Sequence, residues 1–444
     1  MKEHFPWTYA FCVWLWPKSP RGRRVLVVLA GLGLLFVVVH VGLDVIVGRR
    51  LSAATREAEE RYGSFDLATL LPPEVPDAEN RAKVIRAAAE LVPEPGRAIR
   101  RFAVYQPDGP LPAEDRAELE VEVAAGSLAL GLLDHAASRP RANWGILYEE
   151  GVEAKVPPLL AILNVQRLNI AAGRLALLDG RRDDAVAAVA RGAVLAESLR
   201  PEPSLIVQLV RSAADTGVVG LAREIVVAGP PSEAQLVVLD GALGDRDPQG
   251  AMRASLIGEM KTMLASMPGP VYAWDVVGPV PPRLFQNPLL LWLLRPLLRE
   301  NARWYLEVMS GVLEYQHLAR PERERRWGNS PPAPERRAWH LLGAMMVANL
   351  GNAIQRADLW ETRFALARLG IALERHRLSR GVYPDELEAL VPVLLPKLPT
   401  DPFSGAPPEY RRIGDGYLLR SAAEDATLDL IDQRDPILRW EVRR

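Results

Sequence analysis

The sequence is almost without cysteine and is poor in lysine. Its one cysteine, Cys12, lies near the N-terminus, so the rest of the chain can form neither a disulfide nor a cysteine-based metal cluster. Only six of the 54 basic residues are lysines, a bias that GC-rich coding explains more simply than selection for RNA contacts. The formal net charge of −1 gives no overall attraction to nucleic acid. We therefore expect no nucleic-acid partner.

Signatures of common catalytic and cofactor sites are missing as well. The histidines form no HExxH motif, and no nucleophile elbow, phosphate-binding loop or strand-borne dinucleotide-binding motif occurs. Two acid–base pairs, Glu374/His376 and Asp134/His135, stand in charged helical contexts that favour ordinary surface residues. We predict no catalytic, cofactor-binding or metal-binding residue and no cofactor. An active site assembled from dispersed carboxylates would leave no such signature.

One long hydrophobic run is present near the N-terminus. Val25 to Leu43 carries no formal charge, and its nineteen residues would span about 28 Å as a helix, close to the thickness of a bilayer core. His40 and Asp44 lie near one end, where the headgroup region would hydrate them. A signal peptide has a shorter apolar run, and Ser52-Ala53-Ala54 lies too far away to be its cleavage site. We predict an uncleaved transmembrane helix over residues 25–47, with the lipid bilayer as its partner.

Basic residues flank this run unequally. Four of them precede it, Lys18, Arg21, Arg23 and Arg24, whereas Arg49 and Arg50 follow it with glutamates close behind. Basic flanks tend to stay in the cytoplasm. We therefore expect residues 1–24 to be cytoplasmic, the protein to be a single-pass protein of a bacterial inner membrane, and its body to be extracytoplasmic. The aromatic stretch Phe5 to Trp16 indicates either an in-plane anchor or a disordered tail.

Prolines and glycines divide the following sequence into helices. Residues 51–76 read as a juxtamembrane helix and a proline-bearing linker, and residues 77–318 as a helical body in which Asp77 caps the first helix. We predict body helices over residues 78–92, 113–137, 157–180, 183–199 and 204–229. Short turns between them indicate antiparallel hairpins. The piece 171–197 resembles a tetratricopeptide-type hairpin, but no second copy follows at a fixed period, so no repeat array is predicted.

Two segments between the body and the C-terminal part have unusual compositions. Leu284 to Leu298 is strongly apolar but too short to span a bilayer, and we interpret it as a buried core helix rather than a membrane-surface or partner-binding helix. Residues 319–337 are charged, rich in proline and without periodicity. They are interpreted as a solvated linker in preference to a phosphate- or lipid-binding segment.

Residues 338–444 are predicted to form a long helix and a small α+β unit. The helix should run from Trp339 to Arg380 and stop at Gly381, and a short helix should follow over Glu386 to Leu390. The segments EYRRI and GYLLRS alternate around Gly414-Asp415-Gly416, which predicts a β-hairpin. We expect the proline-rich connection to fold back so that Phe403 packs against the long helix. The fold class is therefore mainly α, with strands only after Pro407.

The same segment carries a chain of turn and aromatic residues: Gly381, Tyr383, Pro384, Leu398, Pro399, Asp401, Pro402, Gly405, Tyr410, Gly416, Tyr417 and Ser421. In this pattern it resembles the C-terminal half of type II secretion major pseudopilins, over residues 340–421. The resemblance implies a long helix that leads into a small hairpin unit. The whole layout also looks like that of uncharacterised bacterial single-pass membrane proteins.

The chain departs from the pseudopilin pattern in two ways. The hydrophobic run lies some 300 residues upstream of the unit, and no prepilin-type start precedes it, so pilus assembly does not follow from the resemblance. The family's calcium-binding loop needs glycines that are absent around the acids Glu424, Asp425, Asp429, Asp432 and Asp435, which we interpret as solvated. Two functions remain open: an envelope scaffold or protein-interaction module with a possible envelope protein partner, or a hydrolase-type enzyme with a dispersed site.

Overall fold

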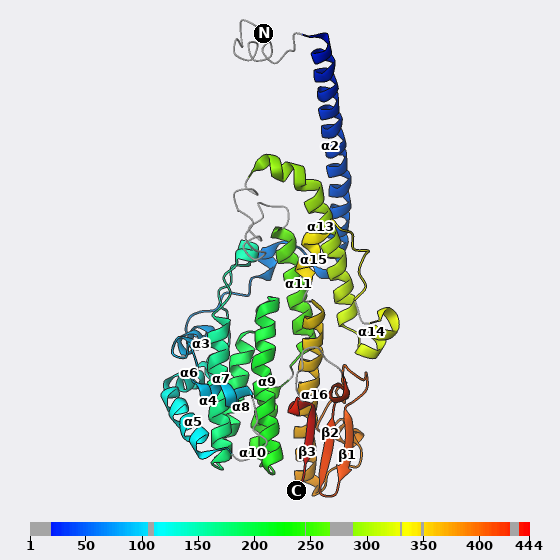
Figure 1. Ribbon diagram of the computed structural model, residues 1–444. Helices are drawn as coiled ribbons and strands as arrows, with labels where there is room; N and C mark the ends of the chain where they lie inside the picture. The colour runs from blue at the N-terminus through cyan, green and yellow to red at the C-terminus, as the bar shows by residue number, and fades with distance from the viewer. Residues whose placement is uncertain are drawn as a thin grey trace.

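The computed structural model describes residues 19–104, 111–244, 246–266, 287–328, 331–347, 350–426 and 435–444. Helices make up most of these residues, and a small antiparallel sheet lies at the C-terminal end, so the predicted mainly α fold class is confirmed. One long helix projects from a helical body, and the sheet lies at the opposite end of the molecule (Figure 1). The aromatic stretch Phe5 to Trp16 lies outside the described residues.

The projecting helix, α2, runs from Pro20 to Tyr62 without a break. The Ser19 side chain accepts a hydrogen bond from the Gly22 backbone N–H (3.0 Å), which caps its first turn. It ends at Gly63, whose φ of 80° suits a residue without a side chain. The hydrophobic run and the predicted juxtamembrane helix are therefore one continuous element that enters the body.

The first part of the body consists of α3 (Arg81–Glu90), α4 (Arg97–Val104), α5 (Ala113–Ala125) and α6 (Ser127–Ala137). Two predictions are wrong here. Asn80, not Asp77, caps α3, because its side chain accepts from Ala82 N (3.1 Å). The helix predicted over 113–137 is two helices divided at Gly126, where a Cβ atom would come within 2.4 Å of Leu168.

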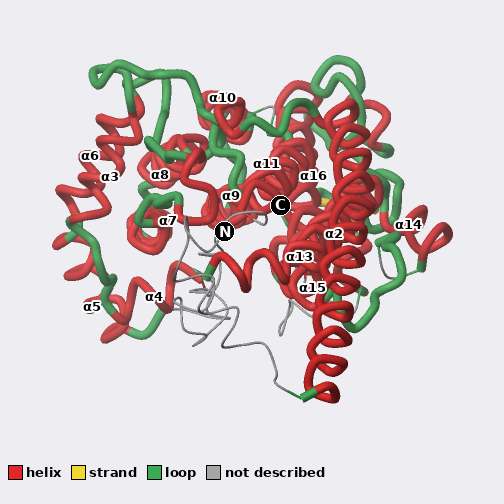
Figure 2. Tube along the Cα trace, turned by 90° about the horizontal axis from the view of Figure 1, so that it is seen from above, coloured by secondary structure: helices red, strands yellow, loops and turns green. Residues whose placement is uncertain are grey.

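The central helices follow the predicted hairpin pattern. They are α7 (Leu159–Leu178), α8 (Arg182–Ser198), α9 (Leu205–Ala228), α10 (Glu233–Leu243) and α11 (Pro248–Ser266). Gly180 has a φ of 75° in the tight turn between α7 and α8, which explains the glycine there. Figure 2 shows α3 to α8 on one side of the body, α2 and α13 on the other, and α9 and α11 between them.

The later helices are α13 (Pro288–Gln316), α14 (Arg320–Trp327), α15 (Leu341–Val347) and α16 (Leu350–Arg380). The interpretation of residues 319–337 as a solvated linker is wrong for its first part. Arg323 on α14 is buried against Asp358 of α16, which holds this short charged helix on the body. The helix predicted over Trp339–Arg380 is described as the two elements α15 and α16, and residues 348–349 lie outside the described part.

The C-terminal sheet has the order β1 (Glu409–Ile413), β2 (Gly416–Arg420) and β3 (Arg439–Val442), with both pairings antiparallel. The predicted hairpin is therefore confirmed, whereas β3 was not predicted. Short 3₁₀ turns complete the described elements: η1 (Leu67–Leu70), η2 (Tyr148–Glu153), η4 (Leu387–Leu390), η5 (Ala422–Asp425) and η6 (Pro436–Leu438).

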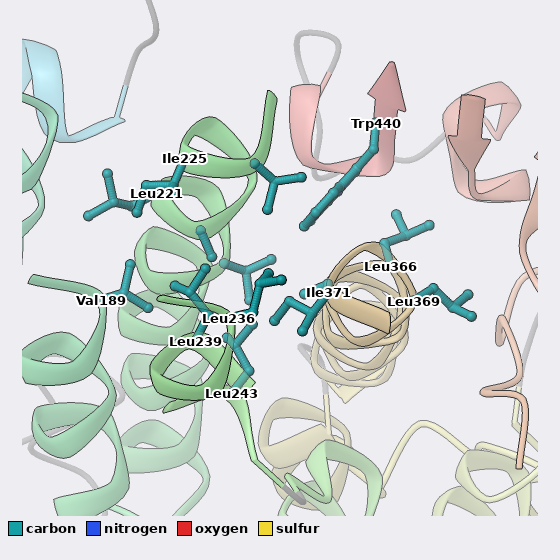
Figure 3. Packing of buried hydrophobic residues seen from close by; sticks show 14 of the residues in the cluster. Val189, Leu221, Ile225, Leu236, Leu239, Leu243, Leu366, Leu369, Ile371 and Trp440 are labelled. Carbon is teal, nitrogen blue, oxygen red and sulfur yellow. The ribbon is translucent and has the colours of Figure 1, made fainter. Parts of the chain in front are cut away.

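The largest hydrophobic core joins the body to this sheet. Leu221 and Ile225 of α9 belong to this core. Leu236 of α10 lies beside Ile371 of α16, and Trp440 of β3 points toward the same helix (Figure 3). A Cβ atom at Gly370 would come within 2.3 Å of the Trp440 ring, so the glycine allows this contact. The C-terminal unit is therefore part of the body's core.

Asp401 organises the proline-rich connection. Its buried carboxylate accepts hydrogen bonds from Phe403 N (2.9 Å) and from the Ser421 hydroxyl (2.7 Å), which joins the turn after Pro399 to the end of β2. Phe403 packs in a small cluster with Leu359 of α16, as predicted. The cluster also includes Leu438 of η6.

Candidate functional site

Within the described residues, two helices are long and apolar enough to cross a membrane: the one that contains α2, and α9. In the most apolar window of each, 6% of the residues are buried for α2 and 61% for α9. The apolar face of α9 is covered by the body, whereas Val25 to Leu43 project outside it as a nearly continuous exposed apolar surface (Figure 1). The N-terminal helix is therefore a candidate membrane-spanning element and α9 is a core helix.

The first half of α13 lies against α2 where the exposed apolar surface ends. His40 is buried there: its ring lies 4.0 Å from the Trp292 ring, and its Nε2 donates to the Leu293 carbonyl oxygen (3.2 Å). Of the described residues of the predicted segment 284–298, only Leu298 is buried, and Leu289 is 64% exposed. The interpretation of this segment as a buried core helix is wrong, because it packs on α2 while most of its side chains stay exposed or half-buried.

An ion pair fixes the same junction one turn further along α2. The Asp44 carboxylate accepts from Arg299 Nη1 (2.9 Å), and Arg295 Nε lies 3.6 Å away. A side chain at Gly48 would collide with Arg299, so glycine gives the guanidinium room to lie across α2. His40 and Asp44 were expected to be hydrated near the end of the run, but residues of α13 bind both.

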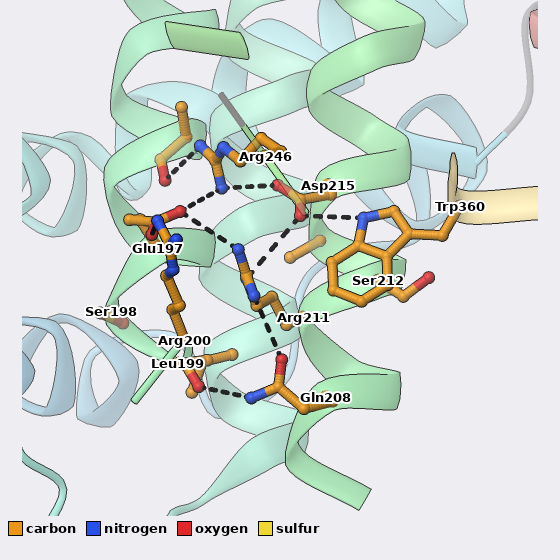
Figure 4. A network of polar contacts seen from close by, with 12 residues as sticks. Glu197, Ser198, Leu199, Arg200, Gln208, Arg211, Ser212, Asp215, Arg246 and Trp360 are labelled. Carbon is orange, nitrogen blue, oxygen red and sulfur yellow. Dashed lines mark hydrogen bonds and ion pairs between the residues drawn. The ribbon is translucent and has the colours of Figure 1, made fainter. Parts of the chain in front are cut away.

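A buried network of charged groups lies inside the body, between α8, α9 and α16 (Figure 4). Asp215 is fully buried and accepts hydrogen bonds from Arg246 Nη1 (3.3 Å) and from Trp360 Nε1 (3.1 Å). Glu197 accepts from Arg211 (3.2 Å) and pairs with Arg246 (2.7 Å). The Arg211 guanidinium lies over the Trp360 ring at 5.1 Å.

The network holds its charges in place. Burial raises the pKa of the Asp215 carboxyl, and Arg246 and Arg211 oppose that rise. Burial acts on Glu197 in the same sense, but its neighbouring arginines hold its pKa below the usual value. Because each carboxylate is surrounded by donors from its own chain, neither is placed to act on a substrate. We interpret the network as a structural link between α8, α9 and α16.

A cavity of about 370 Å³ lies between α7, α9, α16 and the turn before β3. Five arginines line it: Arg167, Arg174, Arg223, Arg356 and Arg363. Among the described residues its acidic members are Glu224 and Asp435, so this part of the lining carries three more positive than negative charges. No signal in the sequence had placed these arginines together, because they come from three helices far apart in the chain.

Two of the five arginines are paired with the two acids. Arg174 donates from Nη2 to Glu224 (2.7 Å), and Arg363 donates from Nη2 to Asp435 (2.6 Å). Arg363 also donates to the Thr216 hydroxyl (3.0 Å), which holds the side chain against α9. Both carboxylates in the cavity are therefore occupied by a guanidinium.

The other three arginines form no ion pair with a described carboxylate. Arg223 donates to the Arg439 carbonyl oxygen (2.8 Å), and burial lowers the pKa of its guanidinium. Arg167 donates to Asn164 (2.9 Å), and Arg356 is exposed. Gln166, which also lines the cavity, has a buried Oε1 without a hydrogen-bond partner in the described part of the chain.

The two predicted acid–base pairs have different outcomes. Asp134 and His135 are exposed on α6, as expected. Glu374 was expected at the surface but is fully buried, where it accepts from the Tyr383 hydroxyl and from Arg444 (both 2.7 Å). His376 bonds the Val382 carbonyl oxygen instead (3.0 Å). These hydrogen bonds could not be predicted from the sequence, because Arg444 is 70 residues from Glu374 along the chain.

The acidic residues near the C-terminus are not arranged around a common point in the described part of the chain. Asp425 pairs with Arg420 (3.1 Å), and Asp435 pairs with Arg363. Glu424 lies near Arg439 (3.5 Å), while Asp429 and Asp432 lie outside the described residues. Within the described ranges, no three histidine, cysteine or acidic residues are grouped so that they could hold a metal ion.

Comparisons of the chain with protein-family models, with curated proteins and with solved structures find no match.

Proposed function

We propose that the protein is a membrane-anchored scaffold or protein-interaction module of the bacterial envelope, held in the inner membrane by residues 25–47 with its body outside the cytoplasm. The observation that carries this proposal is the exposed apolar surface of α2, which continues as one helix into the body. A bilayer removes such a surface from water, at about 25 cal/mol per Å² of apolar area. The more basic N-terminal flank supports the orientation.

The junction between α2 and α13 supports a fixed rather than a flexible attachment. Asp44 and Arg299 pair where the uncharged run Val25 to Leu43 ends, within one helical turn of the end of the proposed span. The exposed leucines of α13, Leu289 and Leu293, lie beside that level and would meet the interfacial region of the bilayer. The body would then keep a set position relative to the membrane.

Exposed apolar side chains on the body support a protein partner. Val121 of α5, Leu128 of α6 and Leu160 of α7 are each about two-thirds exposed or more, at 70%, 66% and 66%. These three helices pack on one another at the side of the body away from α2 (Figure 2). Contiguous apolar surfaces mark protein-binding sites, and we propose that these three side chains belong to one such surface.

The resemblance to pseudopilins fits the same proposal for the C-terminal unit. Several of the matching residues meet: the Tyr383 and Tyr417 rings are 4.9 Å apart, and Asp401 bonds Ser421. We propose that this unit is a pseudopilin-like element used here as a wall of the body, since its core is shared with α9 and α10. An assembly role does not follow from this packing.

The alternative is an envelope hydrolase. It would need a carboxylate free to accept or donate a proton beside a substrate. In the arginine-lined cavity both carboxylates are paired with guanidinium groups, and in the buried network both are enclosed. These contacts favour the scaffold over the enzyme.

A photo-crosslinking amino acid at Leu160 tests the interaction proposal in living cells. We expect one discrete adduct of higher mass from Leu160 and from Val121, identified by mass spectrometry as the same envelope protein. The matched control is the same crosslinker at Val393, which is 86% exposed on the C-terminal unit, where no adduct is expected. Absence of any protein adduct at Val121, Leu128 and Leu160 would contradict the proposal.

A further inference from the structure

The arginine-lined cavity has an excess of positive charge that the described part of the chain does not neutralise. Glu224 and Asp435 neutralise Arg174 and Arg363. Arg167, Arg223 and Arg356 then leave three positive charges around a space of about 370 Å³. Like charges that share a partly buried site repel one another, and an anion in that space would relieve the repulsion.

The chemistry of the lining suits an oxyanion. A guanidinium presents a planar set of N–H donors that matches carboxylate and phosphate oxygens. Two of the unpaired arginines approach from different helices, Arg167 from α7 and Arg356 from α16, so their donors can bind one ligand from two sides. The cavity volume is at the lower end of the range of roughly 300–1,000 Å³ for small-molecule pockets.

The walls leave room for such a ligand. Gly217 and Gly220 of α9 line the cavity without side chains, and Ile437 and Arg174, which also line it, are the side chains nearest to Gly220. The bonds of Arg363 to Asp435 and Thr216 are already formed, so this side of the site is preorganised.

We propose that this cavity is a binding site for a small soluble organic anion that carries a phosphate or several carboxylate groups. The ligand would join α7 and α9 of the body to α16 and to the Asp435–Ile437 turn of the C-terminal unit. The lining helices belong to the body, and the exposed half of α2 projects away from them (Figure 1), which favours a soluble anion over a lipid headgroup. This site does not depend on the proposed scaffold function.

Calorimetric titration of the full chain in neutral detergent tests the proposal. Pyrophosphate probes the phosphate class and citrate the carboxylate class, and we expect a dissociation constant below about 1 mM for at least one of them. Arg356→Gln and Arg167→Gln should each weaken that binding about tenfold, as expected when one charge-assisted hydrogen bond is lost. The matched control is Arg380→Gln, which removes the same charge from the exposed end of α16 and should leave the affinity within about twofold.

Three results would contradict the proposal. Failure of both probes to bind the wild-type chain would overturn the proposal, as would an equal loss of affinity in Arg380→Gln, because the attraction would then come from general surface charge. A third titration adds short-chain phosphatidylglycerol with the pyrophosphate. Displacement of pyrophosphate by this lipid would overturn the assignment to a soluble anion. Thermal unfolding of each variant checks its fold, and two cavity variants keep the test usable if one of them fails to fold.

Discussion

The helices α2 and α9 are both long and apolar enough to span a membrane, but they differ in how much of their apolar surface the rest of the protein covers. The apolar window of α2 is 6% buried, and that of α9 is 61% buried. The charged residues of α9 also differ from those of α2 in their surroundings: Arg211 and Asp215 lie in the closed network, and Glu224 pairs with Arg174. In the apolar run of α2, from Val25 to Leu43, there is no formal charge to satisfy.

The comparison shows what distinguishes a span from a core helix. A core helix can carry charges if neighbouring helices supply partners for them, and the partners of α9 come from α7, α8 and α16. A membrane-spanning helix keeps its charges near its ends, and in α2 Asp44 directly follows the apolar run and is paired with Arg299 of α13. Removing the partners of α9 should therefore damage the body, whereas the exposed apolar part of α2 is proposed to be covered by a bilayer.

The largest expected effect is on the closed network of α9. Asp215→Asn keeps the shape of the side chain but removes its charge, which leaves Glu197 as the one acidic partner of Arg211 and Arg246 among the described residues. We expect the free energy of unfolding at pH 8 to fall by about 3–5 kcal/mol, measured by chemical denaturation in detergent. Asp240→Asn, at an exposed acid of α10, is the control. A loss below about 1 kcal/mol would mean that Asp215 is protonated in the folded protein.

The covering of α9 by α16 depends in turn on the C-terminal unit. Phe403 is 8% exposed and packs on Leu359 of α16. Phe403→Ala should lower the unfolding free energy by about 3 kcal/mol and make the C-terminal unit sensitive to protease. Val393→Ala, at an exposed site of the same unit, should change neither. Unchanged protection of the unit in Phe403→Ala would contradict the packing of its connection on the helix.

A smaller, pH-dependent effect is expected at Glu361 of α16. Burial and the nearby Asp247 raise the pKa of this carboxyl to about 7, so the folded state holds its proton more tightly than the unfolded state does. Stability from this group is therefore complete below pH 4.5 and is lost as the pH rises toward 7. Glu361→Gln should raise the unfolding free energy by about 1–3 kcal/mol at pH 8 and by nothing at pH 4.

The same substitution at Glu335, an exposed glutamate, supplies the reference for this pH dependence. Subtracting the two variants removes the contribution of other titrating groups. An equal stability gain at pH 4 and pH 8 in Glu361→Gln would show that the effect comes from packing and not from the carboxyl charge.

Local sequence signals predicted most of the helices and the hairpin. Prolines, glycines and the apolar spacing placed α7, α8 and α9 close to their observed bounds, because these signals act within a few residues. The strand β3 was missed, since RWEV is short and forms a strand only by pairing with β2, as Leu419 opposite Trp440 shows. Helix α14 was missed because Arg323, which holds it in place, depends on Asp358.

The residues of the candidate sites could not be predicted from the sequence. Arg167, Arg223 and Arg356 share a cavity only because α7, α9 and α16 pack together, and each arginine alone looks like a surface residue. The burial of Glu374 depends likewise on Arg444, at the other end of the C-terminal unit. Long-range pairs of this kind leave no local pattern in composition or periodicity.

The central proposal is that α2 crosses the inner membrane and places the body outside the cytoplasm. Two separate fusions to the C-terminus measure this directly. Alkaline phosphatase is active only outside the cytoplasm, whereas GFP that is exported in unfolded form does not fluoresce. The account predicts an active phosphatase fusion and a dark GFP fusion, both in the membrane fraction. A fluorescent GFP fusion with an inactive phosphatase fusion would contradict it.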